Sequence, residues 1–549
     1  MPSATTPRPP KRLAVFCDGT WVGRETKVED APPSNIRQLA NMVGEVHYTN
    51  DTTSAAIHPI KPHTHSNSEN ITAGYQEGVG LNKNFLQYIW DGATAASISE
   101  ECISVYKYIV ENFDTDHEIW LFGFSRGAFT VRCVAGMINN CGIIKRRSEY
   151  TDAELYRLCY EVFRTYRSAL PSDAPSSSEC QRWKGLDAKV WQVKRPIRFM
   201  GVIDTVGALG IPRLQAGIGF DWSPFEFFDQ SMSAVVQNVW HAPCLHDRLW
   251  IFQPCLVLPD SADEAQDDRT VVRQTWFPGT HYDVGRMTFR FLRQNPVNWM
   301  EEMLGWLPNL LSRTIYPNQV LSDAVLRWIV QGVREVDGES QTPLMPAADQ
   351  DIQRLSEGLA KFATTASKEA EAVTASHYTG SGDIYSDVLA YAPAGILLST
   401  LRNTFSTLTS LLNALLPSLD IGTNIQSLLG VKTLITILTA TNDRRIPGTE
   451  ADIYPYREEE RVRVGGVETV VPSIESLGRM REVQRGGGRE RYPSRTVEAF
   501  WLWKGVFGKE ENGQGGGGGG GGGKGRVNGR VNGEIDGATD GVDGEVNGV

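Results

Sequence analysis

The chain has 549 residues, of which 41% are hydrophobic, and a formal net charge of −11 at pH 7. This acidic balance argues against a nucleic-acid-binding protein, because a polyanionic partner requires a basic surface. The eight cysteines form no Cys-x-x-Cys pair and the nine histidines show no metal-finger spacing. We therefore expect reduced thiols, no metal and no cofactor. The N-terminus lacks an apolar signal stretch, which favours a cytoplasmic location.

Residues 1–11 are rich in proline and are expected to be disordered. From residue 12 to about 290, short apolar runs alternate with helical stretches, which predicts an α/β fold with a mostly parallel sheet flanked by helices. The expected strands end at 17, 122 and 204, and two further strand-to-loop units are expected over 248–258 and 272–285. Helices are expected over 84–113, directly after 125, and from Ser322, which would cap the helix.

The composition changes divide the chain into further parts. We expect an α/β-hydrolase-like catalytic domain over 12–335 with an insertion at 287–321, and a polar insertion or linker over 336–385. A helical cap or lid that returns to the domain is expected over 386–505. Residues 506–549 include nine consecutive glycines and predict a disordered tail, because glycine and charge cannot form a core.

Residues 388–440 are unusually apolar and carry leucines at helical spacing. Arg402, Asp420 and Lys432 interrupt the run, whereas a transmembrane span needs ~20 uninterrupted apolar residues. The preferred interpretation is a helical lid packed on the main domain. Two alternatives stay open, namely a membrane-surface helix that would give peripheral membrane contact and a true span.

The first expected strand ends in Cys17-Asp18-Gly19-Thr20, which is similar to the acidic motif of haloacid-dehalogenase-type phosphatases. That chemistry needs a carboxylate nucleophile two residues before Asp18, where this chain has Phe16. A phosphatase is therefore disfavoured. The string is better interpreted as a loop that brings Gly19 or Thr20 to an active site, with Asp18 and Thr20 bracing the turn. The alternative is a tight turn that Asp18 merely caps.

The strongest chemical motif is Gly-Phe-Ser-Arg-Gly, residues 123–127, between an apolar strand and a helix. This context is the one that a nucleophile elbow requires, with Ser125 on a tight turn and glycines where side chains would collide with neighbouring elements. The backbone N–H of Arg126 would be one oxyanion donor and an N–H near Gly19 or Thr20 the second. A glycine-rich turn with a capping serine is the alternative.

A serine nucleophile needs a base and an acid, which α/β-hydrolases supply in the chain order serine, acid, histidine. Asp204 is the first acid at the end of an apolar strand after Ser125. Among the later histidines, His281 follows an expected strand, as a base should. His377 lies in a polar insertion and His246 precedes an expected strand. His241 is the rival base, and is otherwise expected to be a structural or supporting residue.

Four motifs in order now carry a resemblance, namely VFCDGTW, GFSRGAFTVR, GVIDTVGALG and WFPGTHYDVG. Over roughly 11–290 the chain resembles an uncharacterised α/β-hydrolase-like family that includes the catalytic domains of type VI secretion phospholipase effectors. The resemblance implies a triad of Ser125, Asp204 and His281, the same three residues that chain order selects.

The chain departs from the family after His281. Where the family commonly has Asp-Val-Gly-Gly-Gly, this chain has Asp283-Val284-Gly285-Arg286-Met287, which bears on the loop near the base more than on the triad. Asp283 is a candidate supporting residue. We expect a serine ester hydrolase acting on a lipid or small ester through an acyl-enzyme. A non-catalytic family member that serves as a binding or scaffold protein is the alternative.

Overall fold

The computed structural model describes residues 9–20, 22–23, 32–51, 53, 55–64, 68–78, 98–168, 170–207, 213–215, 219–221, 233–245, 247, 252–257, 269–290, 314–315, 317, 319–338, 340–364, 444, 461–464 and 467–470. The chain divides into two compact units, Met1–Glu498 and Ala499–Val549. All described residues belong to the first unit. The expected tail at 506–549, residues 1–8 of the proline-rich N-terminal stretch and the apolar stretch 388–440 lie outside the described residues.

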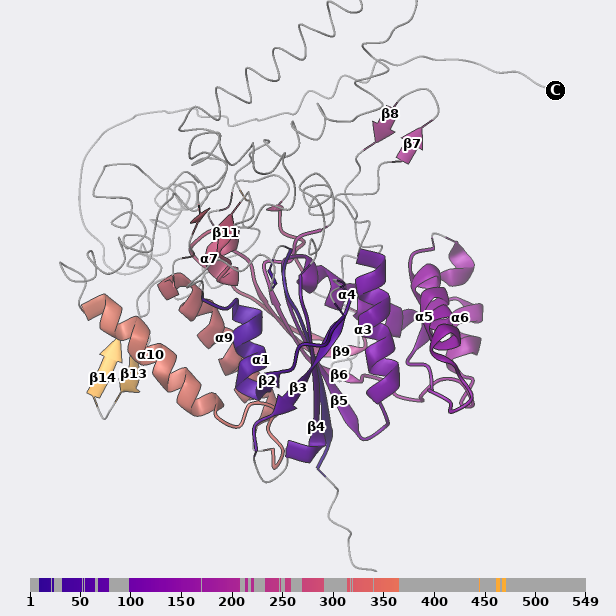
Figure 1. Cartoon of the computed structure of the whole chain (residues 1–549), viewed down its shortest axis with the longest axis horizontal. Helices are drawn as coiled ribbons and strands as arrows, with labels where there is room; N and C mark the ends of the chain where they lie inside the picture. Colours follow the sequence, from indigo (N-terminus) through magenta and orange to yellow (C-terminus); the bar gives the residue numbers. More distant parts are fainter. Residues whose placement is uncertain are drawn as a thin grey trace, which may run out of the picture. The chain divides into compact units, whose positions relative to one another are not determined.

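An eight-stranded sheet forms the centre of the first unit, in the order β10-β9-β6-β5-β1-β4-β3-β2 (Figure 1). The strands from β10 to β4 pair in parallel, and β3 and β2 continue the sheet by antiparallel pairing. The expected α/β class with a mostly parallel sheet is therefore confirmed. The bounds are β1 Lys11–Cys17, β2 Gly44–Val46, β3 Ile57–Pro62, β4 Ile71–Gln76, β5 His117–Phe124, β6 Ile197–Ile203, β9 Val236–Ala242 and β10 Val271–Gln274.

Helices cover both faces of the sheet, as Figure 1 shows. Helices α1, α9 and α10 lie on one side, and α3 and α4 lie on the other, with α5 and α6 outside them. The bounds are α1 Asn35–Val43, α3 Ile98–Asn112, α4 Arg126–Cys141, α5 Asp152–Tyr166, α6 Ser178–Lys184, α7 His281–Gly285, α9 Gln319–Asp337 and α10 Ala348–Thr364.

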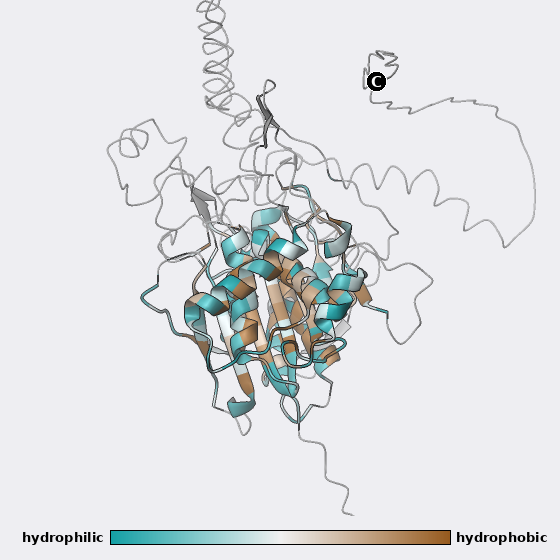
Figure 2. Cartoon of the chain, turned by 90° about the vertical axis from the view of Figure 1, so that its right-hand side faces the viewer, coloured by the Kyte–Doolittle hydropathy of each residue, from teal (hydrophilic) through white to brown (hydrophobic). Residues whose placement is uncertain are grey.

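Each face of the sheet has its own apolar cluster, because side chains alternate along a strand. In β1, Leu13 and Val15 pack with α3 and α4, whereas Ala14 and Phe16 pack with α1 and α9. All four side chains are fully buried. Figure 2 shows the hydrophobic residues gathered on the strands and on the inner helix faces. A sheet buried on both faces needs such continuous apolar strands.

Smaller elements complete the described part of the chain. They are the 3₁₀ turns η2 (Ser68–Asn70) and η3 (Pro171–Asp173), and the antiparallel pairs β7 (Arg213–Gln215) with β8 (Gly219–Asp221), β11 (Phe289–Arg290) with β12 (Thr314–Ile315), and β13 (Arg461–Val464) with β14 (Val467–Val470). Helix α10 contacts α9, β13 and β14. Within the described ranges, no helix is long and apolar enough to cross a membrane.

Two local predictions are wrong. The strand expected over 248–258 does not form in its described part, 252–257, where only an isolated bridge joins Pro254 to Val206. The chain places the strand earlier, at β9, which contains His241. Helix α9 begins at Gln319, so Ser322 lies inside the helix and does not cap it. Its hydroxyl instead donates to the carbonyl of Asp283, 2.5 Å away.

The six neighbouring parallel strands, β10, β9, β6, β5, β1 and β4, end at one edge of the sheet. The register pairs Cys17 with Gly123 and Phe124 with Ile203, which in turn pairs with Ala242. The residues that follow β1, β5, β6, β9 and β10 are therefore brought together at the carboxyl edge. Ligands of open α/β sheets bind at this edge, so it is where the site should be sought.

Candidate active site

Ser125 lies on the sharp turn between β5 and α4. Its backbone has φ 56° and ψ −123°, and the helix starts at the next residue. A positive φ is strained for a residue with a side chain, and such strain is typical of functional sites. The side chain is 3% exposed. The backbone N–H of Ser125 donates to the carbonyl of Ile203 at the end of β6, which fixes the turn to the neighbouring strand (3.0 Å).

The two glycines of this turn allow the close approach of three elements. A Cβ at Gly123 would lie 2.5 Å from Cα of Ala128 in α4. A Cβ at Gly127 would lie 2.2 Å from the carbonyl oxygen of Cys17, at the end of β1. Both distances are far below van der Waals contact, so the expected steric reason for the glycines is confirmed.

Asp204 follows β6 and also has a positive φ, of 39°. Its side chain is fully buried. The backbone N–H of Cys244, in the loop after β9, donates to Asp204 Oδ1 over 3.0 Å. The Cys244 thiol lies 3.4 Å from Oδ2. The carboxylate is thus held by the loop of the next strand in the sheet.

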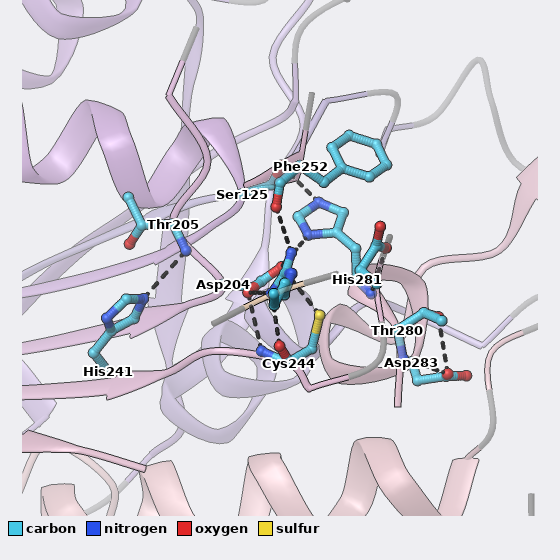
Figure 3. A network of polar contacts seen from close by, with 11 residues as sticks. Ser125, Asp204, Thr205, His241, Cys244, Phe252, Thr280, His281 and Asp283 are labelled. Carbon is cyan, nitrogen blue, oxygen red and sulfur yellow. Dashed lines mark hydrogen bonds and ion pairs between the residues drawn. The ribbon is translucent and has the colours of Figure 1, made fainter. Parts of the chain in front are cut away.

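His281 is the first residue of α7, in the loop after β10, and it connects the other two residues (Figure 3). Its Nε2 lies 2.8 Å from Ser125 Oγ, and its Nδ1 lies 2.6 Å from Asp204 Oδ2. An ionised carboxylate only accepts hydrogen bonds, so Nδ1 carries the proton and Nε2 can accept one from the serine hydroxyl. The structure therefore brings together the three residues that the sequence singled out.

Two aromatic rings stack on the His281 imidazole. The ring centroids of Phe124 and Phe252 lie 4.6 Å and 4.4 Å from that of the imidazole, with interplanar angles of 29° and 19°. Burial lowers the pKa of His281, and the hydrogen bond and charge of Asp204 only partly offset that effect. The imidazole is therefore neutral at pH 7, the state in which it can accept a proton.

Arg444 also reaches this site, from a part of the chain far from the motifs. Its Nη1 lies 2.6 Å from Asp204 Oδ1 and its Nη2 lies 2.9 Å from Asp204 Oδ2. The same guanidinium donates to the carbonyls of Cys244 and Phe252. Burial alone would raise the pKa of Asp204, but Arg444 and His281 hold it well below its usual range. Sequence reasoning missed Arg444, because no local pattern marks it.

The loop that carries His281 is held from several sides. The backbone N–H of His281 donates to Asp247 Oδ2 over 3.1 Å. Asp283 does not face the serine; its Oδ2 accepts from the backbone N–H and the hydroxyl of Thr280, which precedes α7 (2.8 and 2.9 Å). Such pairing of the residue before a helix with the third residue of that helix stabilises the N-terminus of the helix. Asp283 therefore supports the loop of His281.

Arg286 follows Gly285, at the position where a second glycine was compared above. It adopts the left-handed backbone conformation, with φ 55° and ψ 46°. Its side chain is buried and donates from Nε to Asn35 Oδ1 (3.1 Å) and from Nη2 to Asp323. Asn35 in turn donates to the carbonyl of Val284. These contacts offset the cost of a non-glycine residue in this conformation.

His241, the rival base, does not contact Ser125. Its Nε2 accepts from the backbone N–H of Thr205 over 3.3 Å, and its Nδ1 lies 2.8 Å from Gln274 Oε1. Burial, reinforced by the charge of Arg132, lowers the pKa of His241 to about 4. Its two nitrogens are both engaged within the protein. It supports the backbone next to Asp204 (Figure 3).

The loop after β1 lies beside the serine. A Cβ at Gly19 would be 3.1 Å from the Cβ of Ser125 and 2.5 Å from the ring of Phe124. The Gly19 N–H donates to Asp18 Oδ1 (2.9 Å), while Asp18 Oδ2 accepts from Tyr75 (2.8 Å) and from Ser34. Burial raises the pKa of Asp18 to about 6, against the effect of these three donors. Asp18 thus braces the turn.

Of the two expected oxyanion donors in this loop, the N–H of Gly19 is engaged by Asp18, and Thr20 is the other. Thr20 is buried in the same turn, with 7% of its surface exposed. Arg126 is the first residue of α4, where backbone N–H groups have no acceptor within the helix.

Phe16 stacks on Phe122 within the core, with 4.6 Å between ring centroids. Phe16 stands where a phosphatase would carry its nucleophile, and in this chain it is a core residue.

The chemical groups that meet at this edge are those of Ser125, His281 and Asp204. In the described part of the chain, no group of three or more histidine, cysteine, aspartate or glutamate side chains could hold a metal ion. The described cysteines are all free thiols, and all but Cys255 are buried. What the site does offer is a hydroxyl, a neutral imidazole and a buried carboxylate in one line.

Comparisons with known proteins place this geometry in context. The family model described as "T6SS, Phospholipase effector Tle1-like, catalytic domain" matches residues 11–332, more than half of the chain. The chain is 26% identical over 200 residues to "Uncharacterized protein YEL023C" of Saccharomyces cerevisiae. That match covers 34% of this chain and 27% of the yeast protein.

Among solved structures, the chain is similar to the crystal structure of an uncharacterized protein from Pseudomonas aeruginosa. The match has 13% sequence identity and a TM-score of 0.23, and it covers 66% of this chain and 57% of the other. The TM-score is too low for this likeness to bear on the fold or the function.

Proposed function

Because the chain belongs to the family of Tle1-like type VI secretion phospholipase effector catalytic domains, we propose that it is a serine hydrolase that cleaves lipid esters. Membership of this family supports a lipase- or phospholipase-like activity. The proposal goes further and assigns the chemistry to Ser125, His281 and Asp204. The observation that carries it is the line from Ser125 Oγ through both imidazole nitrogens to Asp204 Oδ2, with distances of 2.8 and 2.6 Å.

In the first half of the reaction, Ser125 attacks the carbonyl carbon of an ester. His281 Nε2 takes the hydroxyl proton, and the resulting positive charge is stabilised by Asp204. The imidazolium then gives that proton to the departing alcohol, which leaves an acyl group on Ser125. In the second half, His281 activates a water that releases the acid and restores the serine.

The turn after β5 would act as a nucleophile elbow. The positive φ of Ser125 and the two glycines present the hydroxyl at the sheet edge. The N–H groups of Arg126 and Thr20 would then stabilise the oxyanion. Losing one such donor typically lowers the rate ~10²–10³-fold. The positive end of α4 favours the same negative charge.

The proposed substrates are acyl esters of lipids, which the family suggests. A peripheral membrane contact through 388–440, which lies outside the described residues, stays a prediction, and so does a cytoplasmic location. Soluble esters should also react, because the triad chemistry acts on the ester group itself. A soluble ester is therefore a practical substrate for testing the site.

A fluorophosphonate probe tests the proposal directly, because it labels only an activated serine. The full chain should label at Ser125 and hydrolyse a panel of phospholipids and short p-nitrophenyl esters. Ser125→Ala should lose both properties. Ser178→Ala is the matched control, since Ser178 lies on α6, where its hydroxyl donates to Glu179 Oε2 over 2.9 Å. Equal labelling of wild type and Ser125→Ala would refute the assignment, and a folded wild type without labelling or turnover would favour a binding or scaffold role.

A further inference from the structure

Arg444 forms a two-pronged contact with Asp204. Each terminal nitrogen of the guanidinium faces a different carboxylate oxygen, at 2.6 Å and 2.9 Å. Paired contacts of this kind fix orientation as well as charge, because both groups are planar. The side chains of both residues are fully buried. Asp204 can therefore rotate only by breaking two charge-assisted hydrogen bonds.

The same guanidinium also contacts the backbone of two loop residues near His281. Besides Asp204 it donates to the carbonyl of Cys244, 2.7 Å away, and to that of Phe252. Phe252 is the residue whose ring stacks on the His281 imidazole. One side chain thus contacts the carboxylate that binds the imidazole and the backbone of the residue whose ring covers the imidazole face.

We propose that Arg444 is a positioning residue of the active site, which holds the Asp204 carboxylate toward His281. This inference rests on the proposed triad of Ser125, His281 and Asp204. Arg444 lies beyond residues 11–332, which the family model covers. The site would therefore include one residue that lies more than one hundred positions past the end of that match.

Burial gives the physical reason for the arginine. A buried carboxylate is costly unless paired, and a neutral imidazole supplies one hydrogen bond without a charge. Arg444 supplies the compensating charge before the reaction begins. The same charge opposes protonation of His281, so that the base stays neutral at a lower pH.

Several titratable groups face this cluster from the described residues. His281 comes from α7 and Asp204 from the end of β6, while Cys244 and Asp247 follow β9. Burial raises the pKa of Cys244 well above its usual value, so the thiol is neutral. His241 is neutral because its pKa is about 4. Arg444 is therefore the cation whose removal should change the titration of His281.

The test compares Arg444→Met and Arg444→Lys with wild type in the full chain. The readouts are kcat and KM for a soluble p-nitrophenyl ester across pH, and the rate of fluorophosphonate labelling at Ser125. Arg444→Met should lower kcat roughly 10²-fold with little change in KM, since misplacement by about 1 Å has that effect on rate. Its acid limb in the pH profile should move to higher pH. Arg444→Lys keeps the charge, so it should lose kcat while its acid limb stays near that of wild type.

Arg12→Met is the matched control. Arg12 is also a buried arginine and pairs with Asp337 over 2.6 Å, but it lies near the opposite end of β1 from the catalytic edge. It should lose stability and keep the wild-type pH profile. If Arg444→Met folds with wild-type kcat and acid limb, the inference is wrong. If it does not fold, wild-type kcat in Arg444→Lys overturns the inference in the same way. Wild type that does not label at Ser125 refutes the proposed function instead.

Discussion

Replacing Gly127 by alanine should test how tightly the position of Ser125 depends on close backbone packing. The added Cβ would lie 2.2 Å from the carbonyl oxygen of Cys17 and 2.5 Å from that of Asp18. Ordinary contact begins near 3.4 Å, so α4 and β1 must separate by about 1 Å. Both obstructing atoms belong to the backbone of the central sheet edge, so no side-chain rotation can relieve the clash.

The expected cost follows from two effects of opposite sign. Overpacking of this kind destabilises by about 1–3 kcal/mol, whereas glycine to alanine in an open helix position gains about 0.5–1 kcal/mol. Gly127→Ala should therefore lower the free energy of unfolding by about 1–2 kcal/mol. Because the shift moves the start of α4, kcat for ester hydrolysis should fall ~100-fold.

Gly358→Ala provides the matched control for this prediction. Gly358 lies in α10, and a Cβ there would meet nothing within 4 Å. Both variants are compared by urea unfolding and by fluorophosphonate labelling. Gly358→Ala reports the effect of helix propensity alone, whereas Gly127→Ala adds the steric clash. Gly358→Ala should be as stable as wild type or slightly more so, with full activity. If Gly127→Ala behaves in the same way, the reasoning about the contact of α4 with β1 is refuted.

Three further predictions concern titration and backbone strain. Burial lowers the pKa of His281 from 6.5, and a general base must be unprotonated. The value of kcat/KM should therefore be constant above pH 7 and fall only below about pH 6.5. An acid limb centred above pH 6.5 would contradict the assignment of His281 as the base. The pKa of Asp18 is raised from 3.8 to about 6 by burial, so the folded state binds that proton more tightly, and its stabilising contribution is complete below about pH 4 and lost as the pH rises through 6. The free energy of unfolding of wild type should therefore fall by about 3 kcal/mol relative to Asp18→Asn between pH 3 and 7, at about 1.4 kcal/mol per pKa unit, and parallel stability curves would refute this. Arg286→Ala and Arg286→Gly both remove the side chain, but only alanine keeps the strain of φ 55°; Arg286→Gly should be more stable by about 1 kcal/mol in urea unfolding, and equal stabilities would show that the conformation carries no cost.

Some features of the sequence misled the local prediction for identifiable reasons. Residues 248–258 are apolar, but Pro254 has no N–H to donate to a sheet. The actual strand β9 contains the polar Gln237 and Asn238, which hydropathy disfavours. Their side chains find partners in the chain around β6; the Asn238 amide, for example, donates to the carbonyl of Arg198 over 3.0 Å. Such partners depend on the neighbouring strand, which is why the local pattern did not show them.

The sequence by itself determined the α/β class and the three residues that meet at the sheet edge. Strand alternation and the glycines around Ser125 are local properties, and the carboxyl ends of parallel strands necessarily share one edge, so Asp204 and His281 could be placed there from chain order. Only the tertiary structure decided which groups surround them. Arg444 is 240 residues from Asp204, and Phe252 and Asp247 follow no strand-end pattern, because contacts of this kind depend on where loops return in space. The sequence thus specifies where the reaction can occur, and the packing of distant segments specifies the charge and orientation of the groups that would perform it.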